Sequence, residues 1–151
     1  IGVEKIILNT SLKDENFVRE AVSIFGSSTI VASVDISNNC IYNHVTKTSG
    51  SCDIISYVKK IEELGVGEIM VNSVDRDGCY TGYDLAILKS VAEMVNLPVI
   101  ACGGAANLDD IKNLIKETEC SAAAAGSMFV FYGKYKAVLI TYPEEVELLK
   151  L

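Results

Sequence analysis

Five short apolar runs of the sequence each lead into polar or glycine residues that could bind a ligand or move a proton. If these runs are parallel strands, their carboxyl ends meet at one edge of a sheet, where ligands of α/β proteins bind. The residues at these ends therefore form the candidate site. They are Asn9, Thr10, Asp35, Asn72, Ser73, Asp75, Arg76, Asp77, Gly78, Cys102, Gly103, Gly104, Gly126 and Ser127.

Asp35 follows an apolar run at residues 30–34 and is the main candidate for acid–base chemistry. A carboxylate at a strand end projects into the mouth of the site and can act as a general acid or base. A loop or N-cap carboxylate held by backbone donors fits the position equally well. For Asp75 and Asp77 the same two interpretations are open, and an ordinary polar turn is a third. Strand parity predicts that both face one way while Arg76 pairs with a neighbour.

Two glycine-containing turns are candidates for phosphate binding. Gly103 and Gly104 precede one predicted helix, and Gly126 and Ser127 precede the last one. Backbone N–H groups and a helix N-terminus at such a turn can hold a phosphate. The alternative is that the glycines only close tight turns.

Thiol, metal and cofactor chemistry are not expected. Cys79 and Cys102 lie near strand ends without a histidine beside them, so neither has an activating base. His44 is the only histidine, and no cysteine stands at zinc-finger spacing from it. The odd number of cysteines and the absence of a CxxC motif favour reduced thiols in a cytoplasmic protein. The five are Cys40, Cys52, Cys79, Cys102 and Cys120.

The elements that must position these residues alternate along the chain. Apolar runs of strand length alternate with amphipathic segments that begin near an aspartate, which predicts a parallel α/β sheet, open or part of a barrel. The polar segment 37–51 is expected to be a loop or small hairpin, and Pro143 to separate two short helices in the tail. The strands are predicted at 4–8, 29–34, 68–71, 98–101 and 122–125, and the helices at 14–22, 53–64, 84–95 and 108–115.

Length and charge narrow the class of protein. A chain of 151 residues that is 50% hydrophobic fits one domain covering residues 1–151. The net charge of −7 argues against nucleic-acid and anionic-membrane partners, because phosphates are bound by clustered Lys and Arg. No apolar run approaches the length of a membrane span. The opening residues lack an initiator Met and a signal-peptide pattern, which indicates a trimmed start or a fragment.

Five motifs stand in order along the chain. They are KIILNT at 5–10, EIMVNSVDRDG at 68–78, TGYD at 81–84, PVIACGGA at 98–105 and AAAAGS at 122–127, followed by Phe129. Together they resemble the cyclase subunit of imidazole glycerol phosphate synthase. The TGYD motif separates it from the sister isomerase family, which usually continues with Gly-Pro. The resemblance implies a (β/α)8 barrel of which this chain is strands 4 to 8, a partial TIM barrel.

The resemblance also assigns roles. A glutaminase partner would supply ammonia through the barrel to a bis-phosphorylated ribulosyl aminoimidazole carboxamide substrate, giving imidazole glycerol phosphate and aminoimidazole carboxamide ribotide. Asp35 matches the catalytic carboxylate on the fifth strand. Lys5 and Glu68, otherwise ordinary solvated strand-end charges, match charges ringing the ammonia entrance. The substrate and phosphate contacts are expected among Asn9, Thr10, Asn72, Asp75, Asp77, Gly78, Gly103, Gly104, Gly126 and Ser127.

Departures from the family keep two further hypotheses open. The second catalytic aspartate of the family lies on the first strand, which this chain does not contain. The tail at residues 131–140 is similar to the paralogue encoded with surface-polysaccharide genes, in which a cyclase-like barrel and a glutaminase supply ammonia to amidate an acetamido sugar. The third hypothesis is a non-catalytic, phosphate-binding half-barrel that self-associates, because missing strands would leave two open edges.

Overall fold

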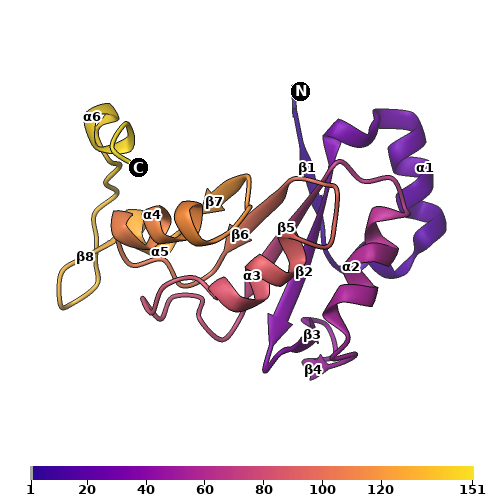
Figure 1. The fold of residues 1–151 in the computed structure, drawn as a ribbon, viewed down its shortest axis with the longest axis horizontal. Helices are drawn as coiled ribbons and strands as arrows, with labels where there is room; N and C mark the ends of the chain where they lie inside the picture. The colour runs from indigo at the N-terminus through magenta and orange to yellow at the C-terminus, as the bar shows by residue number, and fades with distance from the viewer. Residues whose placement is uncertain (1) are drawn as a thin grey trace.

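A computed structural model describes residues 2–151 and shows strands alternating with helices (Figure 1). Five parallel strands follow the spatial order β1-β2-β5-β6-β7. The predicted α/β class and parallel sheet are confirmed, and the sheet is an open section because β1 and β7 do not pair within the described residues. The strands are β1 (Ile6–Leu8), β2 (Ile30–Ser37), β5 (Glu68–Ser73), β6 (Val99–Cys102) and β7 (Ala122–Ala124).

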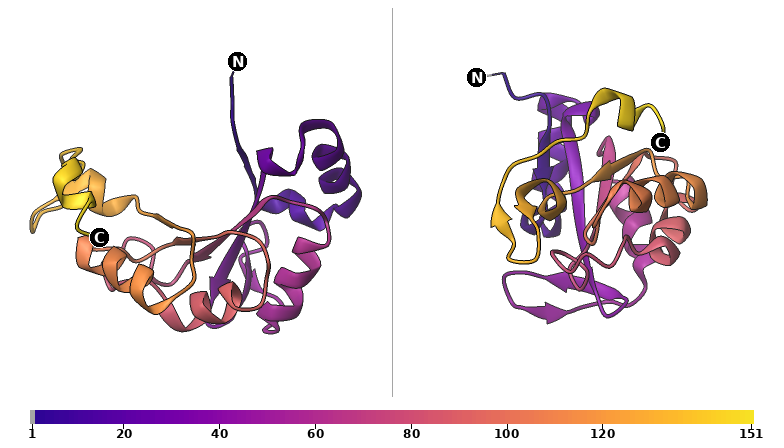
Figure 2. Two further views of the ribbon diagram at one scale, coloured as in Figure 1. Left: turned by 45° about the horizontal axis from the view of Figure 1, so that its top comes forward. Right: turned by 90° about the vertical axis from the view of Figure 1, so that its left-hand side faces the viewer.

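The sheet is curved, and helices cover its convex outer face (Figure 2). Alternate strand residues point outward and pack against these helices, as Ile30, Ala32 and Val34 of β2 do. This packing forms the hydrophobic core, to which Val18, Val58, Leu88 and Leu114 contribute from the helices. The helices are α1 (Glu15–Phe25), α2 (Ile54–Glu62), α3 (Leu85–Ala92) and α4 (Leu108–Glu117), and the short 3-10 turns are η1 (Thr10–Lys13) and η2 (Ser27–Thr29).

Side-chain caps explain where the helices begin. The carboxylates of Asp14, Asp53 and Asp84 accept hydrogen bonds from backbone N–H groups in the first turns of α1, α2 and α3. Asn107 and Asp110 form a reciprocal capping box at the start of α4. Each cap contributes about 1 kcal/mol. The helix starts that the sequence predicts near these aspartates are confirmed.

The segment after β2 folds into a hairpin of β3 (Cys40–Asn43) and β4 (Thr48–Ser49), as one of the two expected forms. Strand β3 also pairs antiparallel with the end of β2, which extends β2 beyond its predicted boundary to Ser37. The amide of Ile41 donates to the Ser51 carbonyl at 2.8 Å, which brings the two ends of the hairpin together. No helix of residues 2–151 is long and apolar enough to cross a membrane.

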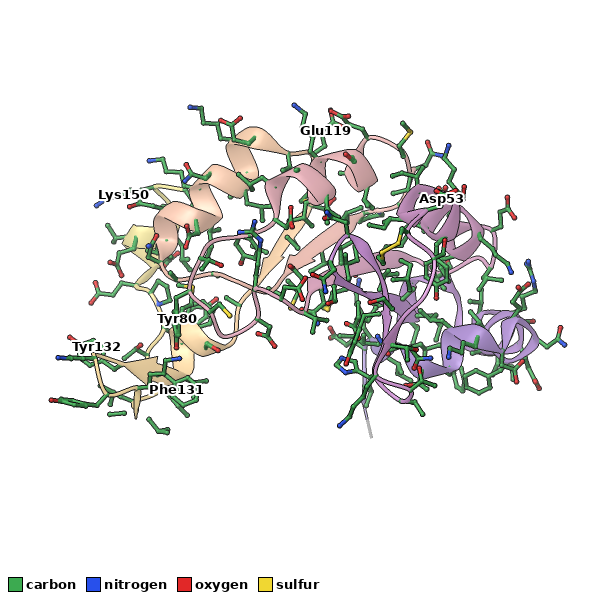
Figure 3. The ribbon with its side chains drawn as sticks, turned by 90° about the horizontal axis from the view of Figure 1, so that it is seen from below. Asp53, Tyr80, Glu119, Phe131, Tyr132 and Lys150 are labelled. Atoms are coloured by element: carbon green, nitrogen blue, oxygen red, sulfur yellow. A yellow bond between two sulfur atoms is a disulfide. The ribbon has the colours of Figure 1, made fainter. Side chains whose placement is uncertain are left out.

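Cys40 and Cys52 form a disulfide across the base of this hairpin, close to Asp53 (Figure 3). The expectation that all cysteines are reduced is therefore wrong for this pair. Spacing in the sequence did not indicate it, because the β3–β4 pairing brings the two residues together. Cys79, Cys102 and Cys120 are free. With one disulfide present, the cysteines do not indicate a reducing compartment, and the cytoplasmic location stays a prediction.

The tail differs from the expected pair of short helices. After α5 (Ser127–Val130), a hairpin of β8 (Phe131–Tyr132) and β9 (Ala137–Val138) replaces the first helix, and α6 (Glu145–Leu148) follows Pro143 as expected. Gly133 and Lys136 both have positive φ, which reverses the chain between the two strands. Figure 3 shows Phe131 and Tyr132 at the opposite end of the molecule from Asp53.

Candidate functional site

The inner, concave face of the sheet carries the polar residues in one row. Strand register places Asp35 of β2 beside Asn72 of β5, and Asn72 beside Cys102 of β6. Residues in register share a face of a sheet, so these three side chains emerge together near the carboxyl ends of their strands. Asn9, just after β1, joins them because its amide reaches Asp35.

Asp35 is 4% exposed and its carboxylate contacts three side chains. The amides of Asn9 and Asn72 donate to its Oδ2 and Oδ1, each at 3.0 Å. The Nε2 atom of His44 lies 2.8 Å from Oδ2. All three partners are side chains and Asp35 lies within β2, so a loop or N-cap carboxylate held by backbone donors is the wrong interpretation. The carboxylate is fixed in one orientation at the head of the sheet.

Asn72 presents a second feature of this row. Its Nδ2 atom is used by Asp35, whereas its Oδ1 atom is buried without a hydrogen-bond partner in the part of the chain that the structure describes. A buried acceptor without a partner is costly. This oxygen packs against Gly103, where an added Cβ would lie 3.1 Å from it.

A cavity of about 260 Å³ opens beside Asp35, between the end of β1 and the β3–β4 hairpin. Asn9, Thr10 and Asp35 all line it, so the structure brings these three predicted site residues together. Tyr42 and Tyr57 were not expected there; Tyr42 comes from β3 and Tyr57 from α2. Lys13 from η1 supplies the cavity with a positive charge.

A second, small hollow of about 20 Å³ gathers most of the predicted phosphate residues. Gly103 and Gly104 have φ values of +90° and +106°, and an added Cβ would lie 2.5 Å and 2.2 Å from the carbonyls of Ser73 and Gly82. Tight backbone approach therefore requires these glycines, whatever the hollow binds. The predicted site residues that line it are Asp77, Gly78, Gly103, Gly104, Gly126 and Ser127.

Asp75 does not join either cavity. Its carboxylate accepts hydrogen bonds from the Asn38 amide at 2.6 Å and the Ser37 hydroxyl at 2.7 Å. The Asn38 backbone bond, followed by the Ser37 bond, lowers the pKa of Asp75. Asp75 and Asp77 therefore have different surroundings, contrary to the parity argument, because the chain turns immediately after β5. Asp75 holds the turn between β2 and β3.

Arg76 and Cys102 behave as the sequence indicated. The Arg76 guanidinium pairs with Asp84 at 3.5 Å, the expected neighbour contact. Burial, with a smaller effect of the Asp77 charge, raises the pKa of the Cys102 thiol. A thiol with a raised pKa is a poor nucleophile, in agreement with the absence of an activating base.

Comparison with known proteins decides the family of this fold. The family model described as "Histidine biosynthesis protein" matches residues 1–136. The chain belongs to the histidine biosynthesis protein family. A Pseudomonas aeruginosa protein, provisionally named imidazole glycerol phosphate synthase subunit hisF2, is 43% identical over 95% of this chain and 60% of its own length. The Prochlorococcus marinus imidazole glycerol phosphate synthase subunit HisF is 39% identical over 84% of this chain and 52% of its own length.

A Leptospira borgpetersenii protein, provisionally named imidazole glycerol phosphate synthase subunit HisF, is 39% identical over 94% of this chain and 59% of its own length. The chain thus spans about 60% or less of the length of these curated relatives. Barrels of this family have eight strands, so the open sheet is a section of such a barrel.

Lys5 and Glu68 lie at the opposite end of the sheet from Asp35. Their side chains form an ion pair and are 47% and 21% exposed. The structure therefore brings the two predicted ammonia-gate residues into contact. Glu68 begins β5 and Lys5 precedes β1, so both lie at the starts of their strands, and the gate role stays a prediction.

Sequence reasoning missed His44 as a member of the site. It was considered only as a zinc ligand, whereas the β3–β4 hairpin folds back and places its ring against Asp35. The one available signal was its position in the long polar connection after the strand that ends in Asp35. Loops after strands supply many functional residues in α/β proteins.

Proposed function

We propose that this chain is part of a cyclase subunit of imidazole glycerol phosphate synthase. The observation that carries the proposal is the buried Asp35 carboxylate, fixed by Asn9 and Asn72 at the strand ends beside a cavity. The family membership supports it. In the proposed reaction, ammonia and the phosphoribulosyl aminoimidazole carboxamide ribotide give imidazole glycerol phosphate and aminoimidazole carboxamide ribotide.

Asp35 would act as the general acid or base of the cyclisation. Its orientation is fixed by amide hydrogen bonds, so a substrate in the adjacent cavity would meet a carboxylate that needs no rearrangement. Asn9 and Thr10 line that cavity and would hold the substrate. Asn72 would serve the reaction by holding the Asp35 carboxylate through its amide.

The glycine-lined hollow would hold a phosphate of the substrate. Gly103 and Gly104 leave the backbone bare of side chains, and Ser127 offers a hydroxyl donor. Gly78, Asp77 and Gly126 complete the lining in this proposal. Asp75 would support the site only through the turn that it holds.

A glutaminase subunit is the proposed partner. The Lys5–Glu68 ion pair at the opposite end of the strands would lie at the entrance through which ammonia arrives. Relatives of this chain are named as subunits of a synthase, which supports an assembly of more than one chain.

Complementation of a histidine auxotroph tests the proposal. The auxotroph would lack its own cyclase subunit and would receive the complete gene together with the glutaminase gene. We expect growth without histidine, and no growth with Asp35→Asn. Asp109→Asn, an exposed change at the start of α4, is the matched control and should support growth. Failure of the unaltered gene to support growth would refute the cyclase proposal.

The tail favours amidation of a surface-polysaccharide sugar as a second candidate. The β8–β9 hairpin carries the segment that is similar to the polysaccharide-linked paralogue. It lies near the phosphate hollow, because the Lys136 ammonium is 3.5 Å from the carbonyl of Gly78, which lines the hollow. In this case the barrel would conduct ammonia without cyclising a ribotide. Expression with the glutaminase would then restore sugar amidation in a deletion strain and leave the histidine auxotroph unable to grow.

The open edges of the sheet favour self-association as a third candidate. Ile6 and Ile7 on β1 are 40% and 53% exposed, and neither β1 nor β7 has a second neighbour within residues 2–151. Unpaired strand edges and exposed apolar residues favour pairing with another chain. Sedimentation of a folded monomer at every concentration would exclude this candidate.

A further inference from the structure

The contact between His44 and Asp35 assigns His44 a place in the reaction, an inference that rests on the proposed cyclase function. The ring Nε2 lies 2.8 Å from Asp35 Oδ2, within hydrogen-bond distance. The other two side chains that contact this carboxylate are the amides of Asn9 and Asn72, which do not titrate. Within residues 2–151, His44 is therefore the titratable side chain in direct contact with Asp35.

The hairpin that carries His44 is held in place by several bonds. The Cys40–Cys52 disulfide closes its base, and the Gly50 amide donates to the Ile41 carbonyl at 2.7 Å. The Tyr42 ring packs edge-on against the His44 ring, with centroids 5.2 Å apart. The turn after His44 is shaped by Asn43, which accepts hydrogen bonds from two following amides. These contacts place the imidazole over the carboxylate.

The two side chains differ in their access to water. The Asp35 side chain is 3% exposed, whereas that of His44 is 55% exposed. While a substrate fills the cavity beside Asp35, the buried carboxylate has no direct contact with solvent to which it could return a proton. An imidazole can accept and release protons near neutral pH, and this one spans the distance from the carboxylate to the surface.

We propose that His44 is the proton-transfer partner of Asp35. Asp35 takes a proton from the substrate, and the proton then passes from the carboxyl group to Nε2 of His44. This restores the carboxylate and forms an imidazolium, which releases one proton to water. In the reverse direction, the imidazolium supplies a proton through Asp35 to the substrate. His44, which follows β3, thus gives the site a second acid–base group beside Asp35.

Nuclear magnetic resonance of the imidazole tests the contact directly. His44 is the only histidine in these 151 residues, so its ring nitrogens give an easily assigned signal in a selectively ¹⁵N-histidine-labelled protein. We expect Asp35→Asn to shift the Nε2 signal and Asp109→Asn to leave it unchanged. An Nε2 signal that is the same in Asp35→Asn and in the unaltered protein would overturn the proposal.

Kinetics of the complete gene product test the proton transfer. In His44→Gln an amide can still donate to Asp35 but cannot carry a proton. We expect kcat for ammonia-dependent cyclisation to fall about 100-fold with KM changed less than about twofold. Added imidazole should restore part of kcat in His44→Ala, because it can occupy the space of the lost ring.

The outcomes separate this proposal from the proposed function. Full turnover by His44→Gln, or no rescue of His44→Ala by imidazole, would overturn the role of His44 while the cyclase function stands. No turnover by the unaltered protein would refute the cyclase function, and the role of His44 with it. A loss confined to kcat and rescued by imidazole supports both.

Discussion

Asp35 and Asn72 stand in direct register on neighbouring parallel strands, and the Asn72 amide donates to Asp35 Oδ1 at 3.0 Å. The Nδ2 atom of Asn72 thus orients the carboxylate, while its buried Oδ1 has no partner within residues 2–151. Asn72 is therefore a positioning residue for the proposed acid–base group.

Asn72→Ala separates orientation from stability. Removing the amide frees the Asp35 carboxylate, and we expect turnover to fall on the order of tenfold to hundredfold. The unfolding free energy should fall by less than about 2 kcal/mol, because the change also removes an unsatisfied carbonyl. Steady-state kinetics and urea denaturation measure the two effects. The exposed Asn96→Ala is the control, and equal turnover by both variants would contradict the role of Asn72.

Two glycines of the small hollow should respond differently to alanine. In Gly104→Ala the new Cβ would lie 2.2 Å from the Gly82 carbonyl at a positive φ, so we expect a loss of at least about 2 kcal/mol in unfolding free energy. Gly126→Ala meets nothing within 4 Å and should cost less than about 1 kcal/mol. Thermal or urea unfolding compares them. Equal stability of the two variants would show that the turn at Gly104 is not as tight as described.

Asp75 should give the protein a pH-dependent stability. The Asn38 amide and the Ser37 hydroxyl lower its folded pKa below the ordinary 3.8. A depressed carboxyl pKa stabilises the fold at pH above the unfolded value, and this contribution is lost as the pH falls through the folded pKa. Asp75→Asn should therefore be less stable than the unaltered protein at neutral pH, with the difference shrinking below about pH 3.8. A difference that stays constant from pH 7 to pH 3 would contradict this assignment.

The disulfide can be counted and removed. Protein purified without reductant and then denatured should show three free thiols, those of Cys79, Cys102 and Cys120. The double change Cys40→Ser and Cys52→Ser should lower the unfolding free energy by about 2 to 3 kcal/mol, because the bond closes a short loop in the unfolded chain. Changing Cys79 alone to serine is the control. Five titratable thiols in the purified protein would show that the pair is not bonded.

Local patterns in the sequence were sufficient for the sheet and its helices. Apolar runs and capping aspartates depend on near neighbours, so β5, β6 and the starts of α1 to α3 follow from composition and spacing. The row of Asp35, Asn72 and Cys102 follows equally, since each residue lies at or near the carboxyl end of a strand of one parallel sheet.

The features that were missed depend on non-local pairing. The β3–β4 hairpin determines both the Cys40–Cys52 bond and the contact of His44 with Asp35, and its register is not visible in a polar segment without clear alternation. The different surroundings of Asp75 and Asp77 arise from the turn after β5, where strand parity no longer applies. The tail hairpin depends on positive φ at Gly133 and Lys136.

The central claim is that Asp35 performs acid–base chemistry in an ammonia-dependent cyclisation. The most direct measurement is turnover of the bis-phosphorylated ribotide with ammonia as the nitrogen source, using the complete gene product and its Asp35→Asn variant. We predict cyclisation by the unaltered protein and a loss of at least about 100-fold in kcat for Asp35→Asn, with KM changed little. Equal turnover by the two proteins would contradict the role of Asp35.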